Sequence, residues 1–171
     1  GTAGVDFPGD VTSGNFGIIC GGIWNTPAAP TVITTAKSSG RATIGAVTTI
    51  LRTTRIAYAS RVGIPFISYF SISGSGSLTM SVDTNLTNDY LNIACDEFSG
   101  VHATPLDVDG GEFTFATDAT PVDSITTLTA NDLIVGVLVA DVGTSDTLDV
   151  GSGYTQIAED ENSSIQFYGV E

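Results

Sequence analysis

Apolar and polar residues alternate along much of the chain, which is typical of β-strands with one buried face. Every second residue is apolar in segment 78–82, and segment 90–98 repeats this pattern. A longer apolar run over residues 132–140 has the composition of a central strand that is covered on both faces. Gly, Pro and Ser separate these segments, and helical periodicity is absent. The pattern therefore predicts short strands joined by tight turns.

About ten such segments follow one another with turn residues between them, which favours two packed antiparallel sheets. We expect an all-β, two-sheet antiparallel β-sandwich, of jelly-roll or immunoglobulin-like type. The strand phases predict which side chains form its core. These are Leu91, Ile93, Phe113, Phe115, Ile134, Val137, Val139 and Phe167.

The opening segment, GTAGVDFPGDVTSGNFG, is rich in Gly and has few apolar residues. This composition predicts an extended N-terminal arm over residues 1–17, followed by a single sandwich domain over residues 18–171. The arm would dock on a neighbouring subunit by adding a strand to an exposed sheet edge, anchored by Val5, Phe7 and Phe16. The alternative is a disordered terminus.

The net charge of −14 is distributed unevenly along the chain. All basic residues lie within residues 11–82, a stretch without Asp or Glu, whereas residues 83–171 include many acidic residues and no basic one. The basic residues are Lys37, Arg41, Arg52, Arg55 and Arg61. In one interpretation, Arg and Asp side chains pair within one subunit. In the other, basic and acidic faces of neighbouring copies meet, and the four Arg residues make the contacts.

The net negative charge also limits which partners the chain can bind. Nucleic acid and anionic membranes both require a basic surface, so neither is expected as a partner. No stretch is apolar for long enough to form a transmembrane helix, and the first ten residues have no signal-peptide pattern. We therefore expect no membrane anchor.

Residues for catalysis are sparse. The single histidine, His102, lies in a loop-like segment without the signature of a nucleophilic triad. Asp96 and Glu97 are adjacent on a strand and face opposite sides, so they cannot form the carboxylate pair of a glycosidase. We expect Glu97 to accept hydrogen bonds from a turn or from an Arg at the strand end. The sequence predicts no catalytic residue, and without phosphate-binding glycine motifs it predicts no cofactor.

Metal binding has one weak candidate. Asp107, Asp109 and Glu112 resemble a fragment of a calcium loop. Gly111, however, occupies a position that needs an oxygen ligand. We therefore favour a solvated acidic turn and expect no metal.

The two cysteines, Cys20 and Cys95, do not have a zinc-binding spacing. They form either one disulfide between the sheets or two buried thiols, and we favour the thiols.

Segment 92–107, NIACDEFSGVHATPLD, has a hydrophobic strand followed by Glu97-Phe98-Ser99-Gly100 and then Pro105-Leu106-Asp107. Further matches lie at residues 30–32, 57–59, 78–82 and 131–136. Together they resemble a β-sandwich family of tailed-phage virion proteins and bacterial surface proteins, over roughly residues 16–171. The motifs are structural, so the resemblance implies a fold and a setting but no active site. Cys95, Asp96 and the Gly-rich opening depart from the family pattern.

These observations predict a non-enzymatic virion structural protein, a decoration, fibre or tail-associated subunit at the virion surface or otherwise extracellular. Its partners would be copies of itself, or a major capsid or tail protein. One alternative is a carbohydrate-binding module or adhesin on a bacterial surface, with Trp24 and tyrosines stacked on a surface glycan. Another alternative is a filament subunit completed by a neighbour's arm.

Overall fold

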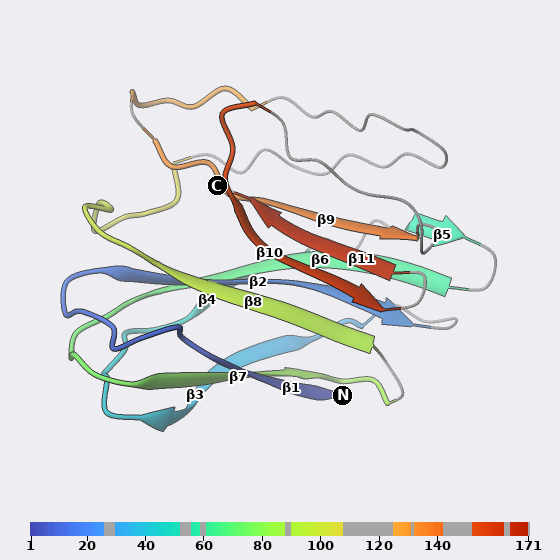
Figure 1. Cartoon of the computed structure of the whole chain (residues 1–171), viewed down its shortest axis with the longest axis horizontal. Helices are drawn as coiled ribbons and strands as arrows, with labels where there is room; N and C mark the ends of the chain where they lie inside the picture. The colour runs from blue at the N-terminus through green and yellow to red at the C-terminus, as the bar shows by residue number, and fades with distance from the viewer. Residues whose placement is uncertain are drawn as a thin grey trace.

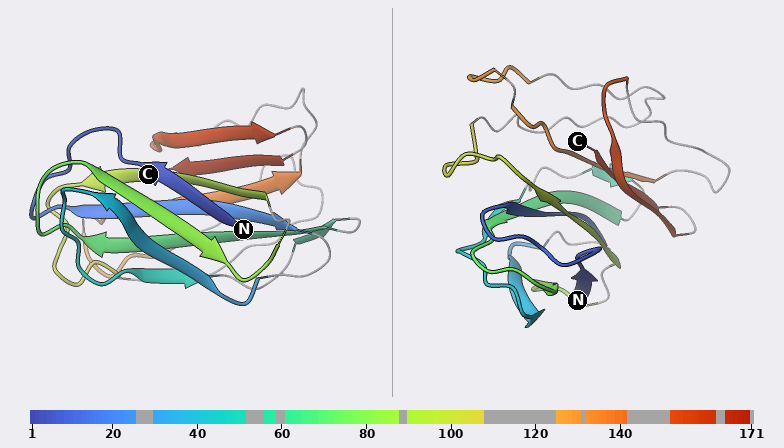
Figure 2. Two further views of the ribbon diagram at one scale, coloured as in Figure 1. Left: turned by 90° about the horizontal axis from the view of Figure 1, so that it is seen from below. Right: turned by 60° about the vertical axis from the view of Figure 1, so that its left-hand side comes forward.

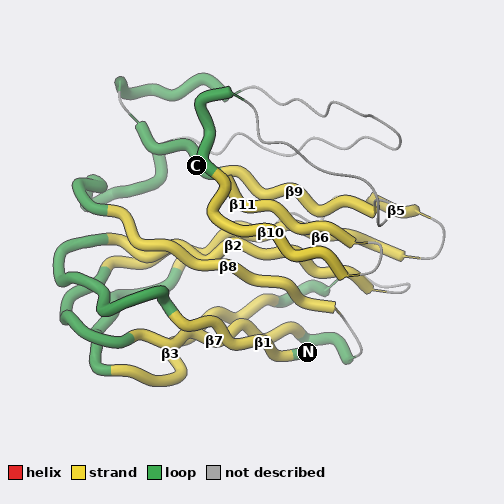
Figure 3. The backbone as a smooth tube through the Cα atoms, in the orientation of Figure 1, coloured by secondary structure: helices red, strands yellow, loops and turns green. Residues whose placement is uncertain are grey.

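A computed structural model describes residues 1–25, 30–51, 56–58, 61–87, 90–107, 125–130, 132–141, 152–162 and 165–170. All regular structure in these ranges is β (Figure 3). The strands are β1 (Thr2–Asp6), β2 (Phe16–Asn25), β3 (Ile33–Gly40), β4 (Thr48–Leu51), β5 (Ile56–Tyr58), β6 (Arg61–Ser71), β7 (Leu78–Thr84), β8 (Tyr90–Phe98), β9 (Gly136–Asp141), β10 (Gln156–Asn162) and β11 (Ile165–Val170).

The strands form three antiparallel sheets arranged in layers (Figures 1 and 2). A five-stranded sheet, β4-β6-β2-β8 with β5 also paired to β6, lies in the middle. The sheet β1-β7-β3 packs on one of its faces and completes a β-sandwich. The sheet β10-β11-β9 lies against the opposite face. The predicted all-β, two-sheet antiparallel sandwich is confirmed, and the third sheet is an addition that the strand pattern did not reveal.

The order of strands within the sandwich resolves its type. The chain passes back and forth between the two sheets through β1, β2, β3 and β4. On its return, β6 inserts between β2 and β4, and β7 inserts between β1 and β3. Such nesting of later strands between earlier ones is typical of jelly rolls, so this connectivity favours the jelly-roll alternative over the immunoglobulin-like one.

The opening segment is part of the sandwich. Strand β1 pairs along its whole length with β7, from Thr2 opposite Asp83 to Asp6 opposite Thr79. Phe7 and Phe16 are buried, and Val5 packs against the main core. The prediction of an extended arm over residues 1–17 is therefore corrected. Backbone pairing with β7 compensates for the few apolar side chains, and those few are buried within their own chain.

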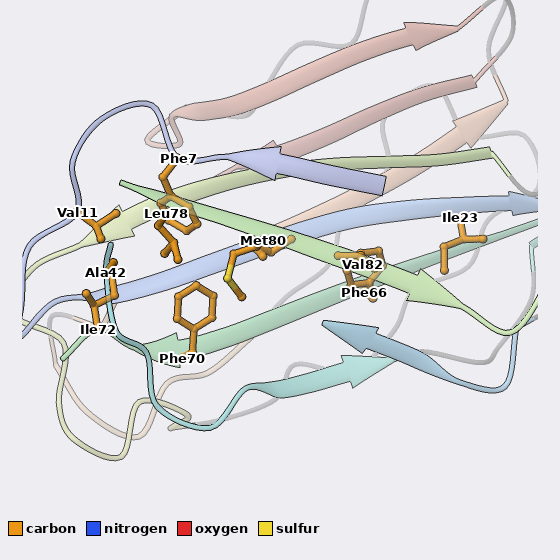
Figure 4. Packing of buried hydrophobic residues seen from close by; sticks show 11 residues of the cluster. Phe7, Val11, Ile23, Ala42, Phe66, Phe70, Ile72, Leu78, Met80 and Val82 are labelled. Carbon is orange, nitrogen blue, oxygen red and sulfur yellow. The ribbon is translucent and has the colours of Figure 1, made fainter. Parts of the chain in front are cut away.

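The main core lies between β1-β7-β3 and the five-stranded sheet. Phe66 and Phe70 extend from β6 towards Met80 and Val82 of β7 (Figure 4). The buried members of this cluster come from strands of both sheets and from the loops beside them, so the core joins the two sheets. They are Phe7, Val11, Ile19, Ile23, Ala42, Phe66, Phe70, Ile72, Leu78, Met80 and Val82.

The predicted core residues fall into four groups. Leu91 and Ile93 are partly buried against the main core, as their alternation in β8 requires. Val139 is buried, and Val137 packs beside it between the middle and third sheets. Ile134 is partly buried. Phe113, Phe115 and the side chain of Phe167 lie outside the described part of the chain.

Strand β2 is covered on both faces, which accounts for its apolar composition. Ile19 and Ile23 join the main core on one side. Cys20 and Trp24 point to the other side and pack under the third sheet, where Trp24 contacts Val139. A strand in this position has no polar face, so its sequence is a continuous apolar run.

Three glycines of β2 and β6 lie directly opposite large aromatic residues. Gly17 pairs with Phe70 and Gly21 pairs with Phe66, both on the main-core face. On the other face Gly63 pairs with Trp24. A Cβ added at any of these glycines would lie 2.4–2.7 Å from a ring atom of its partner. The aromatic ring thus occupies the space above a backbone that has no side chain.

Candidate functional site

His102 lies in the loop after β8 and is exposed. Its Nδ1 lies 2.8 Å from the hydroxyl of Thr104 and accepts the backbone N–H of the same residue at 3.2 Å. Both contacts are local and order the loop. In the described part of the chain, the ring has no hydrogen bond to a Ser or Cys nucleophile, which a triad requires.

Glu97 connects the end of β8 to the loop before β2. One carboxylate oxygen accepts the backbone N–H of Thr12 at 2.6 Å and the side-chain amide of Asn15 at 2.8 Å. The prediction that Glu97 accepts hydrogen bonds from a turn is confirmed. Asp96 instead accepts the backbone N–H of Glu97 at 2.7 Å. Both carboxylates therefore accept hydrogen bonds at the end of β8. Charge-assisted bonds of this kind stabilise the local structure.

A second polar cluster lies inside the sandwich. The hydroxyl of Ser68, on β6, lies 2.8 Å from that of Thr35 on β3 and 2.7 Å from that of Thr49 on β4. Ser68 and Thr35 are buried. The three hydroxyls satisfy one another and link the two sheets, so this cluster has a structural explanation.

The two cysteines are free thiols on opposite faces of the middle sheet. Cys20 pairs with Ala94, and Cys95 pairs with Ile19, so their side chains point apart and cannot form a disulfide. The Sγ of Cys95 donates a weak hydrogen bond to the carbonyl oxygen of Asp6 at 3.4 Å. Burial raises the pKa of each thiol to about 12. Two thiols rather than a disulfide are confirmed, although only Cys20 is buried and Cys95 is partly buried.

This raised thiol pKa predicts a loss of stability in alkaline solution. Between pH 9 and pH 12 the unfolded chain loses the Cys20 proton while the folded chain retains it, so rising pH favours unfolding. From pH 8 to pH 10 the free energy of unfolding should fall by roughly 1 kcal/mol more in the wild type than in Cys20→Ala. Urea unfolding at both pH values measures this difference. Equal pH dependence in the two proteins would contradict the burial of Cys20.

Asp107 is exposed and holds the loop 125–130. Its carboxylate accepts the backbone N–H of Leu128 at 2.6 Å and the hydroxyl of Thr129 at 3.2 Å. The bond from Leu128 is the main cause that lowers the pKa of Asp107. Asp109 and Glu112, the other two residues of the calcium candidate, lie outside the described residues. Within the described ranges, no three His, Cys, Asp or Glu side chains gather as a metal site.

Lys37 and Arg41 make no ion pair with an acid in the described part of the chain. The ammonium group of Lys37 donates to the carbonyl oxygens of Gly40, at 3.0 Å, and Ala42. Arg41 is exposed and makes no ion pair with a described residue. Arg52 and Arg55 lie outside the described residues, and Arg61 is described only as the first residue of β6. Arg41 thus offers no support for pairing within the subunit.

The aromatic side chains do not form a described platform for sugar. Trp24 is 2 % exposed, so it belongs to the core. Tyr90 and Tyr154 are the exposed aromatic residues of the described part, and they come from different places. Tyr90 opens β8 in the middle sheet, whereas Tyr154 precedes β10 in the third sheet. Of the Trp24 and tyrosines that the carbohydrate-binding alternative named, Trp24 is therefore not available to stack on a sugar ring.

Comparison of the chain with known protein families, curated proteins and solved structures returned no match. Within the described ranges, no helix has the length and apolar character needed to cross a membrane.

Proposed function

We propose that this chain is a non-enzymatic structural subunit that acts through protein contacts. One observation carries the proposal. Glu97, His102 and Asp107 make hydrogen bonds that hold loops in place, whereas the exposed Arg41 has no ion pair with an acid in the described part of the chain. Such a distribution suits a protein that binds through its surface.

The setting that we propose is a virion, in which the chain is a decoration, fibre or tail-associated subunit. The resemblance of segment 92–107 to the virion and surface-protein family supports this setting. The fold is compatible with it, because a layered β-sandwich presents edges and loops on a stiff frame. The partners would be copies of itself or a capsid or tail protein.

Self-association of the purified chain tests this proposal. We expect analytical ultracentrifugation at increasing protein concentration to show oligomers, and electron microscopy to show regular assemblies. A glycan array and a panel of hydrolase substrates should give no signal. A chain that stays monomeric throughout and binds a glycan would overturn the proposal in favour of a carbohydrate-binding module.

A further inference from the structure

The third sheet is formed by strands that follow one another at the C-terminal end of the chain. Among the described strands, β9, β10 and β11 are hydrogen-bonded only to one another. Between described strands, the chain passes from the sandwich to the third sheet once, through the connection from β8 to β9. The third sheet (Figure 1) can therefore move away from the middle sheet without breaking any strand pairing that the structure describes.

The two sheets of the sandwich are joined in a different way. The connections β1–β2, β2–β3, β3–β4, β6–β7 and β7–β8 all pass from one of these sheets to the other. Side chains add further links. The hydroxyl of Thr35 on β3 lies 2.8 Å from that of Ser68 on β6, and Sγ of Cys95 on β8 donates to the carbonyl oxygen of Asp6 on β1. The sandwich is therefore tied together at many points and should open only as a whole.

The interface under the third sheet contains apolar side chains and an unsatisfied polar group. Cys20 is buried in a small group that Val137 and Ile157 cover, and Trp24 is buried against Val139. In the described part of the chain, the indole Nε1 of Trp24 is buried and has no hydrogen-bond partner. A buried donor without a partner costs free energy, which contact with water would recover. This group therefore favours opening at this interface.

We propose that the third sheet is a separable layer that lifts from the middle sheet while the sandwich stays folded. Units that open separately are commonly contiguous in sequence, as β9, β10 and β11 are. Opening uncovers the outer face of the middle sheet, including Cys20, Trp24 and Ile67, which the closed chain keeps covered. This conformational change is a property of the fold and does not depend on the proposed structural function.

Thiol labelling of the full chain in its native state tests the proposal. Cys95→Ala leaves Cys20, under the third sheet, as the only thiol. The matched control is Cys20→Ala/Cys95→Ala/Val82→Cys, whose only thiol lies in the main core, where Val82 is buried. The Cys20 thiol should react with a disulfide reagent at least about tenfold faster than the Val82→Cys thiol. Urea should speed the Cys20 reaction less steeply than it drives global unfolding, because opening exposes only part of the buried surface.

Circular dichroism and urea unfolding show whether each protein is folded and give its global free energy of unfolding. The value for the Cys95→Ala protein is itself a reference, so the test stays decisive if the control variant does not fold. Cys20 labelling with the rate and urea dependence of global unfolding would overturn the proposal, because all three sheets would then open as one unit. Labelling that does not depend on urea would also overturn it, since this indicates a local fluctuation around one side chain.

Discussion

Replacing Phe66 with Ala should lower the free energy of unfolding by about 3–5 kcal/mol, which is a large fraction of the stability of a single domain. Phe66 is 1 % exposed and lies at the centre of the main core, between the middle sheet and β7. Its ring also covers Gly21, so no neighbouring side chain of β2 can fill the space that the ring leaves. The loss of stability therefore includes the cost of the cavity that remains, in addition to the lost burial of the apolar ring.

Urea unfolding followed by fluorescence or circular dichroism measures this effect. The matched control is Leu128→Ala, because Leu128 is 79 % exposed and its truncation should change stability by less than about 0.5 kcal/mol. If Phe66→Ala cost no more than the control, the core between the two sheets would be in doubt.

The sequence predicted the sandwich because local patterns determine most of it. The alternation of Leu91, Ile93 and Cys95 set the phase of β8 correctly, and Glu97 continued it to the strand end. Free, separate thiols were also favoured, because Cys20 and Cys95 both lie in apolar strand-like runs. In each case residues close in sequence determine the feature, so the sequence pattern predicts it.

Features that depend on distant segments were missed. The Gly-rich opening looked too polar to fold, but pairing with β7, far along the chain, makes it a strand. The partners of Glu97, Thr12 and Asn15, also come from a distant loop. A sequence signal existed for the opening segment, since Val5 and Phe7 alternate with polar residues. It was weak because an edge strand needs few apolar side chains.

The charge pattern shows a further limit of sequence reasoning. The separation of basic from acidic residues is visible in the sequence, yet pairing within the chain and pairing between copies predict the same composition. The structure adds the strand order, which places β4 and β8 at opposite edges of the middle sheet.

The glycine opposite Phe66 should be equally intolerant of change, and Gly21→Val should cost about 3 kcal/mol. An added Cβ would lie 2.4 Å from the Phe66 ring and 2.8 Å from the backbone oxygen of Asn92. The ring could rotate away only into the packed core, and the Asn92 oxygen belongs to the paired strand β8. Gly9→Val serves as the control, because a Cβ at Gly9 meets no atom within 4 Å.

A double-mutant cycle separates this clash from any general intolerance of β2. In the Phe66→Leu background the smaller side chain leaves room, so Gly21→Val should cost less than it does in the wild type. The coupling between the two sites should be on the order of 1 kcal/mol or more, within the range for residues in direct contact. Urea unfolding of the four proteins gives this value. Strictly additive effects would mean that the ring of Phe66 does not lie over Gly21, and the cross-strand pairing of β2 with β6 would need a different register.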